Sequence, residues 1–99
     1  MNSLASFPTH CHASIQRFGK PHEEIHRWLD EFFGVDPYRS RHRRIRHHEE
    51  GIAKAVSIFG EYAEEVARDH IVIDLKEEGW KDSDHFPKDE ADYVKMGFW

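Results

Sequence analysis

Residues 38–59 read YRSRHRRIRHHEEGIAKAVSIF, and this stretch decides the expected fold. Asp36 and Pro37 precede it as a helix cap and a first-turn proline, and the next helix breakers are Gly51 and Gly60. Its apolar residues recur at spacings of 7, 7, 4 and 3, as expected for one side of a helix: Tyr38, Ile45, Ile52, Val56 and Phe59. The segment predicts one long central helix.

Two shorter helices are expected on the N-terminal side. Thr9 is a typical N-cap residue and Gly19 a typical stop, which predicts a helix over 9–19. The helical spacing of its apolar residues predicts one buried face: Cys11, Ile15 and Phe18. The next helix runs from Pro21 to Gly34. Its apolar residues follow the i, i+3, i+4, i+7 pattern of one buried face: Ile25, Trp28, Leu29 and Phe32.

Helical spacing also continues on the C-terminal side. Residues 61–78 carry a helical apolar stripe, although residues 71–73 alone could form a short strand. A loop over 79–86 and a short helix after Pro87 complete the chain. We therefore expect an all-α fold, a small helical bundle of four to five helices with one long central helix.

Length and composition narrow the class of protein. Ninety-nine residues fit a single domain over 1–99, with poor order expected at 1–8 and 79–86. Only 38% of the residues are hydrophobic, so the core is small and we expect a homo-oligomer. The formal net charge of -5 argues against binding of long nucleic acid through overall basicity. Cys11 is the only cysteine and no apolar run approaches the roughly 20 residues of a membrane span, so we expect a cytoplasmic protein without a membrane partner.

Arginine and histidine concentrate in the central segment. The chain has nine histidines, several-fold above the usual content, and five of its fourteen Lys+Arg lie between Arg39 and Arg46. On a continuous helix, Arg43, Arg46 and His47 would face outward as a cationic strip, and Arg41 and His48 would lie beside the apolar stripe. Such a strip suits phosphate oxygens, but it would equally suit a solvated face paired with acidic residues.

Other histidines lie near predicted buried faces: His12, His26 and His70. His26 with Asp30 and His70 with Asp74 are i, i+4 pairs, in which the aspartate could orient the imidazole or join it as a metal ligand. The chain has no HExxH motif, so the cofactor stays open, and a divalent metal is one alternative. The other alternative is that these histidines are buried without a metal and form hydrogen bonds with local partners. His10, at a segment end, is assigned no role.

The run Arg41-His42-Arg43-x-x-Arg46-His47-His48-x-Glu50-Gly51-Ile52 resembles a family of small uncharacterised proteins from bacteria and their phages. The resemblance covers most of residues 12–75, and the chain departs from it at Gly19, Arg44 and Asp69 and in the connection after Gly60. A compact phage-type protein with an Arg/His pocket also looks like phage proteins that disarm nucleotide-based immune signalling. That likeness implies an anti-defence protein of the host cytoplasm that cages or cuts a cyclic nucleotide.

The leading hypothesis is a pocket for a phosphate-bearing nucleotide, which the protein sequesters or cleaves. The expected ligand-binding residues are Arg41, Arg43, Arg46, His12, His26 and His70. If the ligand is cleaved, general acid and base catalysis would come from His42, His47 and His48.

Two alternatives belong to other classes. In a metal-dependent phosphohydrolase, the ion would be held by His26, His48, His70 and Asp74, although the chain lacks the contiguous His-Asp pair of the histidine-aspartate helical hydrolases. In a non-enzymatic interaction protein, the basic strip would dock an acidic partner.

Overall fold

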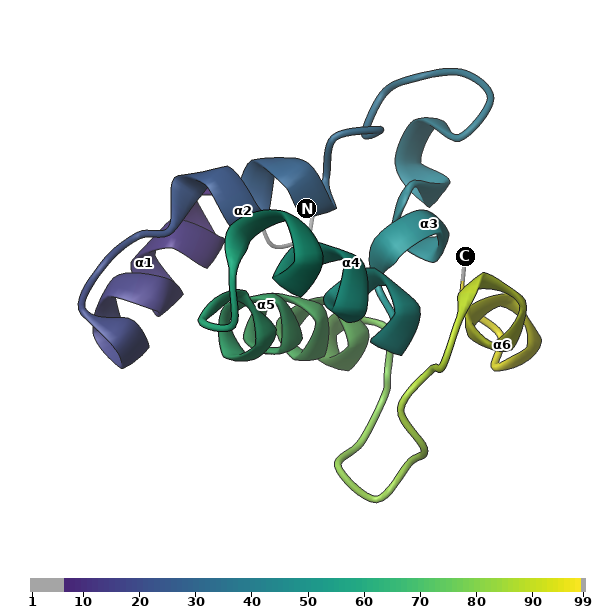
Figure 1. The fold of residues 1–99 in the computed structure, drawn as a ribbon. Coiled ribbons are helices and arrows are strands. Elements are labelled where there is room, and N and C mark those ends of the chain that lie inside the picture. Colours follow the sequence, from purple (N-terminus) through teal and green to yellow (C-terminus); the bar gives the residue numbers. More distant parts are fainter. Residues whose placement is uncertain (1–6, 99) are drawn as a thin grey trace.

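The computed structural model describes residues 7–98, apart from the side chain of Ser40, and this part of the chain is helical without strands (Figure 1). Its helices are α1 (Phe7–Phe18), α2 (Glu23–Leu29), the 3-10 helix η1 (Arg39–Arg41), α3 (Arg43–Arg46), α4 (Glu49–Phe59), α5 (Ala63–Glu77) and α6 (Glu90–Lys95). The expected all-α helical bundle is confirmed, with six α-helices in the described residues. Residues 71–73 lie within α5.

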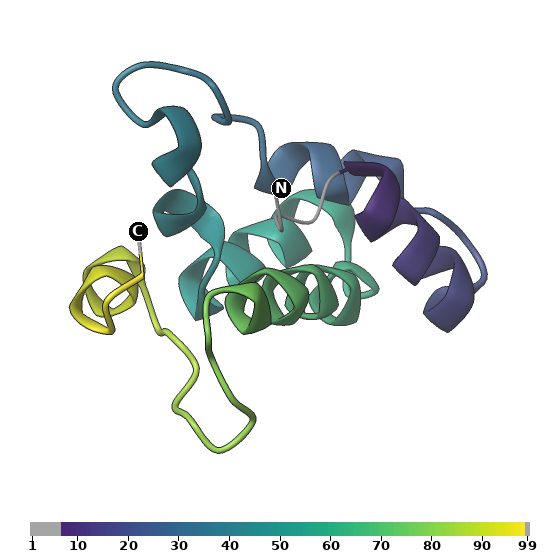
Figure 2. The ribbon, with the colours of Figure 1, turned by 180° about the vertical axis from the view of Figure 1, so that it is seen from behind.

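Helix α5 is the centre of the bundle. It packs against α4, α2 and α1. Helix α6 packs against α3, on the side of the molecule opposite α1 (Figures 1 and 2). The buried apolar residues come mainly from α2, α4 and α5 and are joined by two from the C-terminal part: Ile25, Leu29, Ile52, Ala55, Ala63, Val66, Ala67, Ile71, Leu75, Trp80 and Tyr93. Ala55 on α4 and Ala63 and Ala67 on α5 are completely buried.

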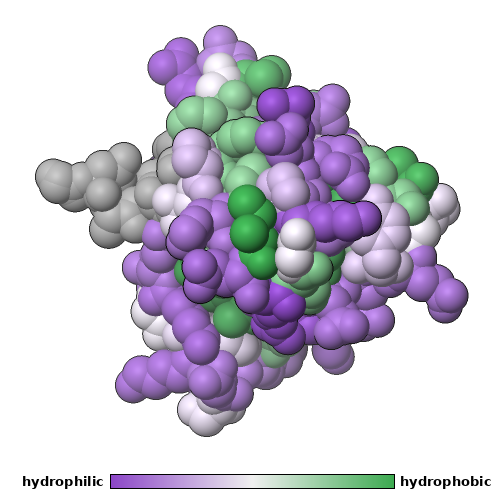
Figure 3. Space-filling model, turned by 90° about the vertical axis from the view of Figure 1, so that its left-hand side faces the viewer, coloured by the Kyte–Doolittle hydropathy of each residue, from purple (hydrophilic) through white to green (hydrophobic). Residues whose placement is uncertain are grey.

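The surface is mostly hydrophilic on the side shown in Figure 3, where hydrophobic patches are small and separate. None of the described helices is long and apolar enough to cross a membrane. Residues 1–6, part of the end for which we expect poor order, lie outside the described residues.

The prediction of one continuous helix over 38–59 is wrong. The segment is divided into η1, α3 and α4, and Arg39 has φ 52°. The second break follows Arg46: His47 has φ -85° and ψ 61°, and His48 is extended before α4 begins. The His48 side chain caps α4, because its Nδ1 accepts a hydrogen bond from the Gly51 backbone N–H at 3.0 Å. The change of direction turns both histidines into the protein, and both are buried.

Gly51 permits this break. A Cβ at this position would lie 1.8 Å from the backbone oxygen of Arg46, so the chain can fold back on itself only where the side chain is hydrogen. The constraint is a close approach of two backbone segments, which hydrophobic spacing does not reveal.

The Gly51→Ala variant tests the break. Its methyl group would collide with the Arg46 backbone, and we expect the free energy of unfolding to fall by about 1 to 3 kcal/mol or more in urea denaturation. Lys54→Ala, on the exposed side of α4, is the control and should change stability by less than about 0.5 kcal/mol. Equal stability of the two variants would contradict the close approach.

Candidate metal centre

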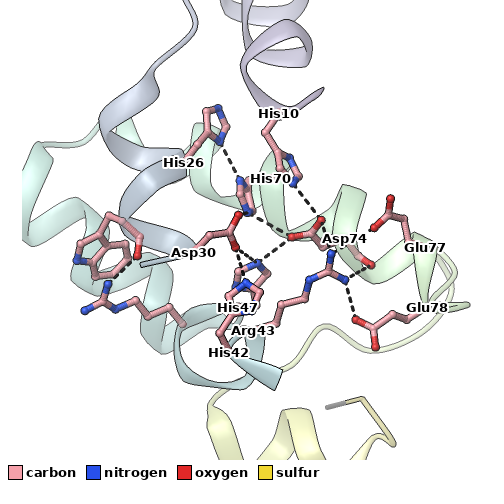
Figure 4. A network of polar contacts seen from close by, with 12 residues as sticks. His10, His26, Asp30, His42, Arg43, His47, His70, Asp74, Glu77 and Glu78 are labelled. Carbon is pink, nitrogen blue, oxygen red and sulfur yellow. Dashed lines mark hydrogen bonds and ion pairs between the residues drawn. The ribbon is translucent and has the colours of Figure 1, made fainter. Parts of the chain in front are cut away.

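Three helices bring two histidines and two aspartates together in the interior (Figure 4). His70 and Asp74 are one turn apart on α5 and face the same way. Asp30 directly follows α2, and His47 directly follows α3. The break after Arg46 therefore supplies one member of the group.

The four ligand atoms lie within 4.8 Å of one another. His47 Nε2 is 2.9 Å from Asp74 Oδ2 and 3.6 Å from Asp30 Oδ1. His70 Nε2 is 3.2 Å from Asp74 Oδ2 and 3.5 Å from Asp30 Oδ2. Nitrogen and oxygen ligands bound about 2.0 to 2.2 Å from one ion are about 3 to 3.5 Å apart, so these spacings fit a common divalent ion.

Ring orientation also suits convergence on one ion. The rings of His47 and His70 are inclined at 69°, so the in-plane lone pairs of their nitrogens can meet at one point. His70 is completely buried, yet its Nε2 makes no hydrogen bond to the described residues, although it faces two carboxylates. A buried polar atom without a hydrogen bond is uncommon, and this nitrogen has only the longer ion-pair contacts with the two carboxylates.

The electrostatics keep both carboxylates ionised. Burial would raise the pKa of Asp74, but its contacts with His10, His47 and His70 outweigh burial and hold that pKa far below its usual range. Asp30 is affected in the same way, since its contacts with His42 and His70 lower its pKa against the effect of burial.

The two candidate imidazole ligands, His47 and His70, differ in their protonation. Burial lowers the pKa of His47 to about 4, so this ring is neutral at pH 7, as a metal ligand must be. Burial opposes protonation of His70 too, but the carboxylates of Asp30 and Asp74 outweigh it and raise the pKa of this ring. A positive charge is therefore favoured at His70 Nε2.

Further side chains orient the two carboxylates. His10 Nε2 and Arg43 Nη2 lie 3.0 and 3.1 Å from Asp74 Oδ1, on the oxygen that does not face the histidine pair. His42 Nε2 lies 2.8 Å from Asp30 Oδ1. Such outer contacts are typical of protein metal sites, because they fix the ligand before the ion arrives.

The metal candidates proposed from the sequence are placed in part as expected. His70 and Asp74 belong to the group, and His26 adjoins it through His70, with 2.8 Å between the two Nδ1 atoms. His48 does not belong to it: its ring caps α4, with Nε2 3.0 Å from the Arg44 carbonyl oxygen. His47 takes its place because the break rotates the two residues relative to a continuous helix.

The residues expected to bind or cleave a phosphate ligand are divided. His42, Arg43, His47 and His70 lie in or beside the cluster, together with His26. Arg43 is buried and also pairs with Glu77 and Glu78. Arg46 donates to Glu31 and to the Trp28 carbonyl and lies over the Trp28 ring. His12 is exposed on α1, and Arg41 is exposed in η1.

Sequence reasoning missed the role of His10 and the buried face of α1. The apolar residues predicted a face of Cys11, Ile15 and Phe18, but the helix buries His10, Cys11 and Ser14, and Ile15 is 48% exposed. The signal that could have found this face is the i, i+4 spacing of His10 and Ser14, a polar pair matching the inward histidines of α2 and α5.

Comparison with known proteins gives a family. Residues 5–96 match the Domain of unknown function (DUF6915). The chain belongs to this family. No curated protein and no solved structure matches the chain. The family description names no activity, so we infer the function of this DUF6915 chain from the geometry of the His/Asp cluster.

The buried histidines predict acid sensitivity of the metal-free protein. Burial lowers the pKa of His26 to about 3 and of His47 to about 4, whereas unfolded histidines titrate near ~6.5. Below that pH these two histidines bind protons in the unfolded chain but stay neutral in the folded chain. The free energy of unfolding therefore falls as the pH drops toward 4. His70 acts in the opposite direction, since its raised pKa favours the folded state below pH ~6.5.

We therefore expect the free energy of unfolding to decrease by about 2 kcal/mol between pH 7 and pH 5, measured by urea denaturation with a chelator present. Equal or higher stability at pH 5 would contradict the burial of neutral histidines.

Removing the charge of Asp74 is expected to be costly. Asp74→Asn leaves Arg43, His10 and His47 without their shared carboxylate, and breaking a buried ion pair typically costs about 3 to 5 kcal/mol. Asp69→Asn is the control on the same helix: its partner Arg17 is exposed, and the loss should stay below about 1 kcal/mol in the same denaturation experiment. Similar losses in the two variants would show that Asp74 is not the centre of the network.

Proposed function

We propose that this protein binds one divalent transition-metal ion through Asp30, His47, His70 and Asp74 and uses it to hydrolyse a phosphate ester. The observation that carries the proposal is His70 Nε2, a fully buried nitrogen that faces two ionised carboxylates and makes no hydrogen bond to them. An ion placed between these atoms would give His70 Nε2 the partner that it lacks, and it would bind the two carboxylates that already face this nitrogen.

The donor set supports an ion of the zinc, manganese, iron or nickel class. Imidazole nitrogen is a ligand for these metals, whereas calcium and magnesium prefer ligand sets made of oxygen. A bound ion of this class supplies a water molecule of lowered pKa as a nucleophile near neutral pH.

Solvent reaches the group at Asp30. Its side chain is 27% exposed, whereas those of His47, His70 and Asp74 are at most 2% exposed. His42 lies beside Asp30, and its Nε2 is 2.8 Å from Asp30 Oδ1. Its Nδ1 makes no hydrogen bond to the described residues. His42 is therefore the side chain placed to pass a proton to or from a ligand that arrives at Asp30.

The substrate class comes from the sequence. A phosphate ester, and a nucleotide in particular, is the expectation from the arginine and histidine run, and its cyclic form and a phage anti-defence role remain predictions from the resemblance. Within the described residues, Arg43, Arg44 and Arg46 each pair with carboxylates of this chain. A phosphate or an acidic partner that bound to these arginines would have to displace those pairs. We therefore favour a phosphate ester that binds at the metal ion over a metal-free phosphate pocket or a docking strip.

Metal binding is tested by titrating the chelator-treated protein with Zn²⁺ and Mn²⁺ in a calorimeter. We expect one ion per chain, and His47→Gln should weaken binding at least ~100-fold because a ligand is lost. His48→Gln is the matched control, because the His48 ring caps α4 and does not face the proposed ion. The metal affinity of this variant should stay within a few-fold of that of the unsubstituted protein. Loss of binding in His48→Gln but not in His47→Gln, or no binding at all, would contradict the proposed ligands.

Hydrolysis is tested separately with the metal-loaded protein and a panel of phosphomonoesters, linear dinucleotides and cyclic nucleotides. We expect phosphate-ester cleavage that disappears with chelator and in Asp30→Asn. Metal binding without cleavage of any panel member would overturn the hydrolase part of the proposal and leave a structural metal site.

A further inference from the structure

A line of three buried side chains begins at His70 and continues through His26 to Ser14, on the side of His70 away from the carboxylates. Figure 4 shows its first two members. His70 Nδ1 is 2.8 Å from His26 Nδ1, and His26 Nε2 is 2.6 Å from Ser14 Oγ. The three residues come from α5, α2 and α1 and are at most 1% exposed. The proposed metal ligand His70 is therefore connected through hydrogen bonds to α2 and α1.

The short distance between the two rings restricts their protons. Two ring nitrogens 2.8 Å apart share one proton, because two lone pairs or two N–H groups would repel at that distance. With an ion on Nε2, neutral His70 carries its proton on Nδ1 and donates it to His26. His26 then holds its own proton on Nε2 and donates it to Ser14 Oγ. The chain of contacts thus allows a single arrangement in the metal-bound protein.

A second metal site in this region does not fit the geometry. Nitrogens of His10, His26 and His70 also lie within 4.8 Å of one another. However, the His10 and His70 rings are stacked, with centroids 3.6 Å apart and planes inclined at 15°. Ligand lone pairs lie in the ring plane, so stacked rings cannot direct them at a common ion. Hydrogen bonding along the line explains the short contacts better.

We propose that His26 is a positioning residue for the metal centre: it accepts the Nδ1 proton of His70 and thereby holds Nε2 of that ring toward Asp30 and Asp74. The inference deepens the proposed function and rests on it. Ser14 completes the arrangement by accepting the remaining proton of His26, which prevents the His26 ring from turning. His26 itself does not contact the ion.

The experiment compares Zn²⁺ affinities, measured by competition with a chromophoric chelator. His26→Leu removes the acceptor and should weaken binding about 10- to 100-fold, the usual effect of losing an outer partner of a metal ligand. His26→Gln keeps an amide oxygen that can accept the proton and should recover much of the affinity. Ser14→Ala should weaken binding by a smaller factor. His12→Leu, at an exposed position on α1, is the control and should leave the affinity unchanged.

A spectroscopic measurement on the unsubstituted protein keeps the test independent of folding in the variants. Histidine ¹⁵N chemical shifts of the Zn²⁺-loaded protein should show the proton of His70 on Nδ1 and that of His26 on Nε2. A proton on His26 Nδ1 in that state would overturn the inference.

The failures of the two proposals are distinguishable. If the unsubstituted protein binds no Zn²⁺, the metal centre is wrong, and the role of His26 falls with it. If that protein binds Zn²⁺ and His26→Leu binds it equally well, only the positioning role of His26 is wrong.

Discussion

The buried carboxylate of Asp74 is the interaction on which the rest of the structure depends. His10 reaches it from α1, Arg43 from α3, His47 from the break that follows α3, and His70 from its own helix. Burying an ionised carboxylate is unfavourable unless charge and hydrogen bonds compensate. The helices that carry these partners must therefore meet at Asp74, and this requirement orders the bundle around a polar centre beside its small apolar core.

The balance of charge at this centre connects folding with the proposed metal binding. Two carboxylates, Asp30 and Asp74, face His70 Nε2, and together they raise the pKa of that ring despite its complete burial. In the metal-free protein a proton on His70 supplies positive charge at this point. A divalent cation would supply more charge at the same point, so protons and metal compete for His70. The same geometry accounts for the folding of the metal-free protein and for the position of the proposed ion.

Much of the fold could be predicted from the sequence because it depends on local signals. Apolar spacing and glycine stops indicate an all-α bundle, and the i, i+4 spacing of His70 and Asp74 places both on one face of a helix. The break between His47 and His48 could not be predicted in this way. It depends on a side-chain cap and on contact between Gly51 and the Arg46 backbone, which arise only when the chain folds back.

In the candidate site, too, local signals could be predicted from the sequence and contacts between helices could not. The apolar spacing of α1 predicts that its apolar side is buried, because burial of apolar surface is the general rule. Here the helix lies on a polar centre, and its buried residues His10 and Ser14 match polar partners on other helices. Complementarity between polar faces on separate helices is a tertiary property, and a periodicity within one helix does not contain it.

The most direct measurement is a crystal structure of the protein soaked in Zn²⁺, with anomalous data collected on both sides of the zinc absorption edge. The account predicts one strong peak about 2.0 to 2.1 Å from Nε2 of His47 and of His70, with oxygens of Asp30 and Asp74 as further ligands and one position taken by a water molecule. A peak at His48 or at the stacked His10 and His70 rings, or no peak with these four residues in their present positions, would contradict it.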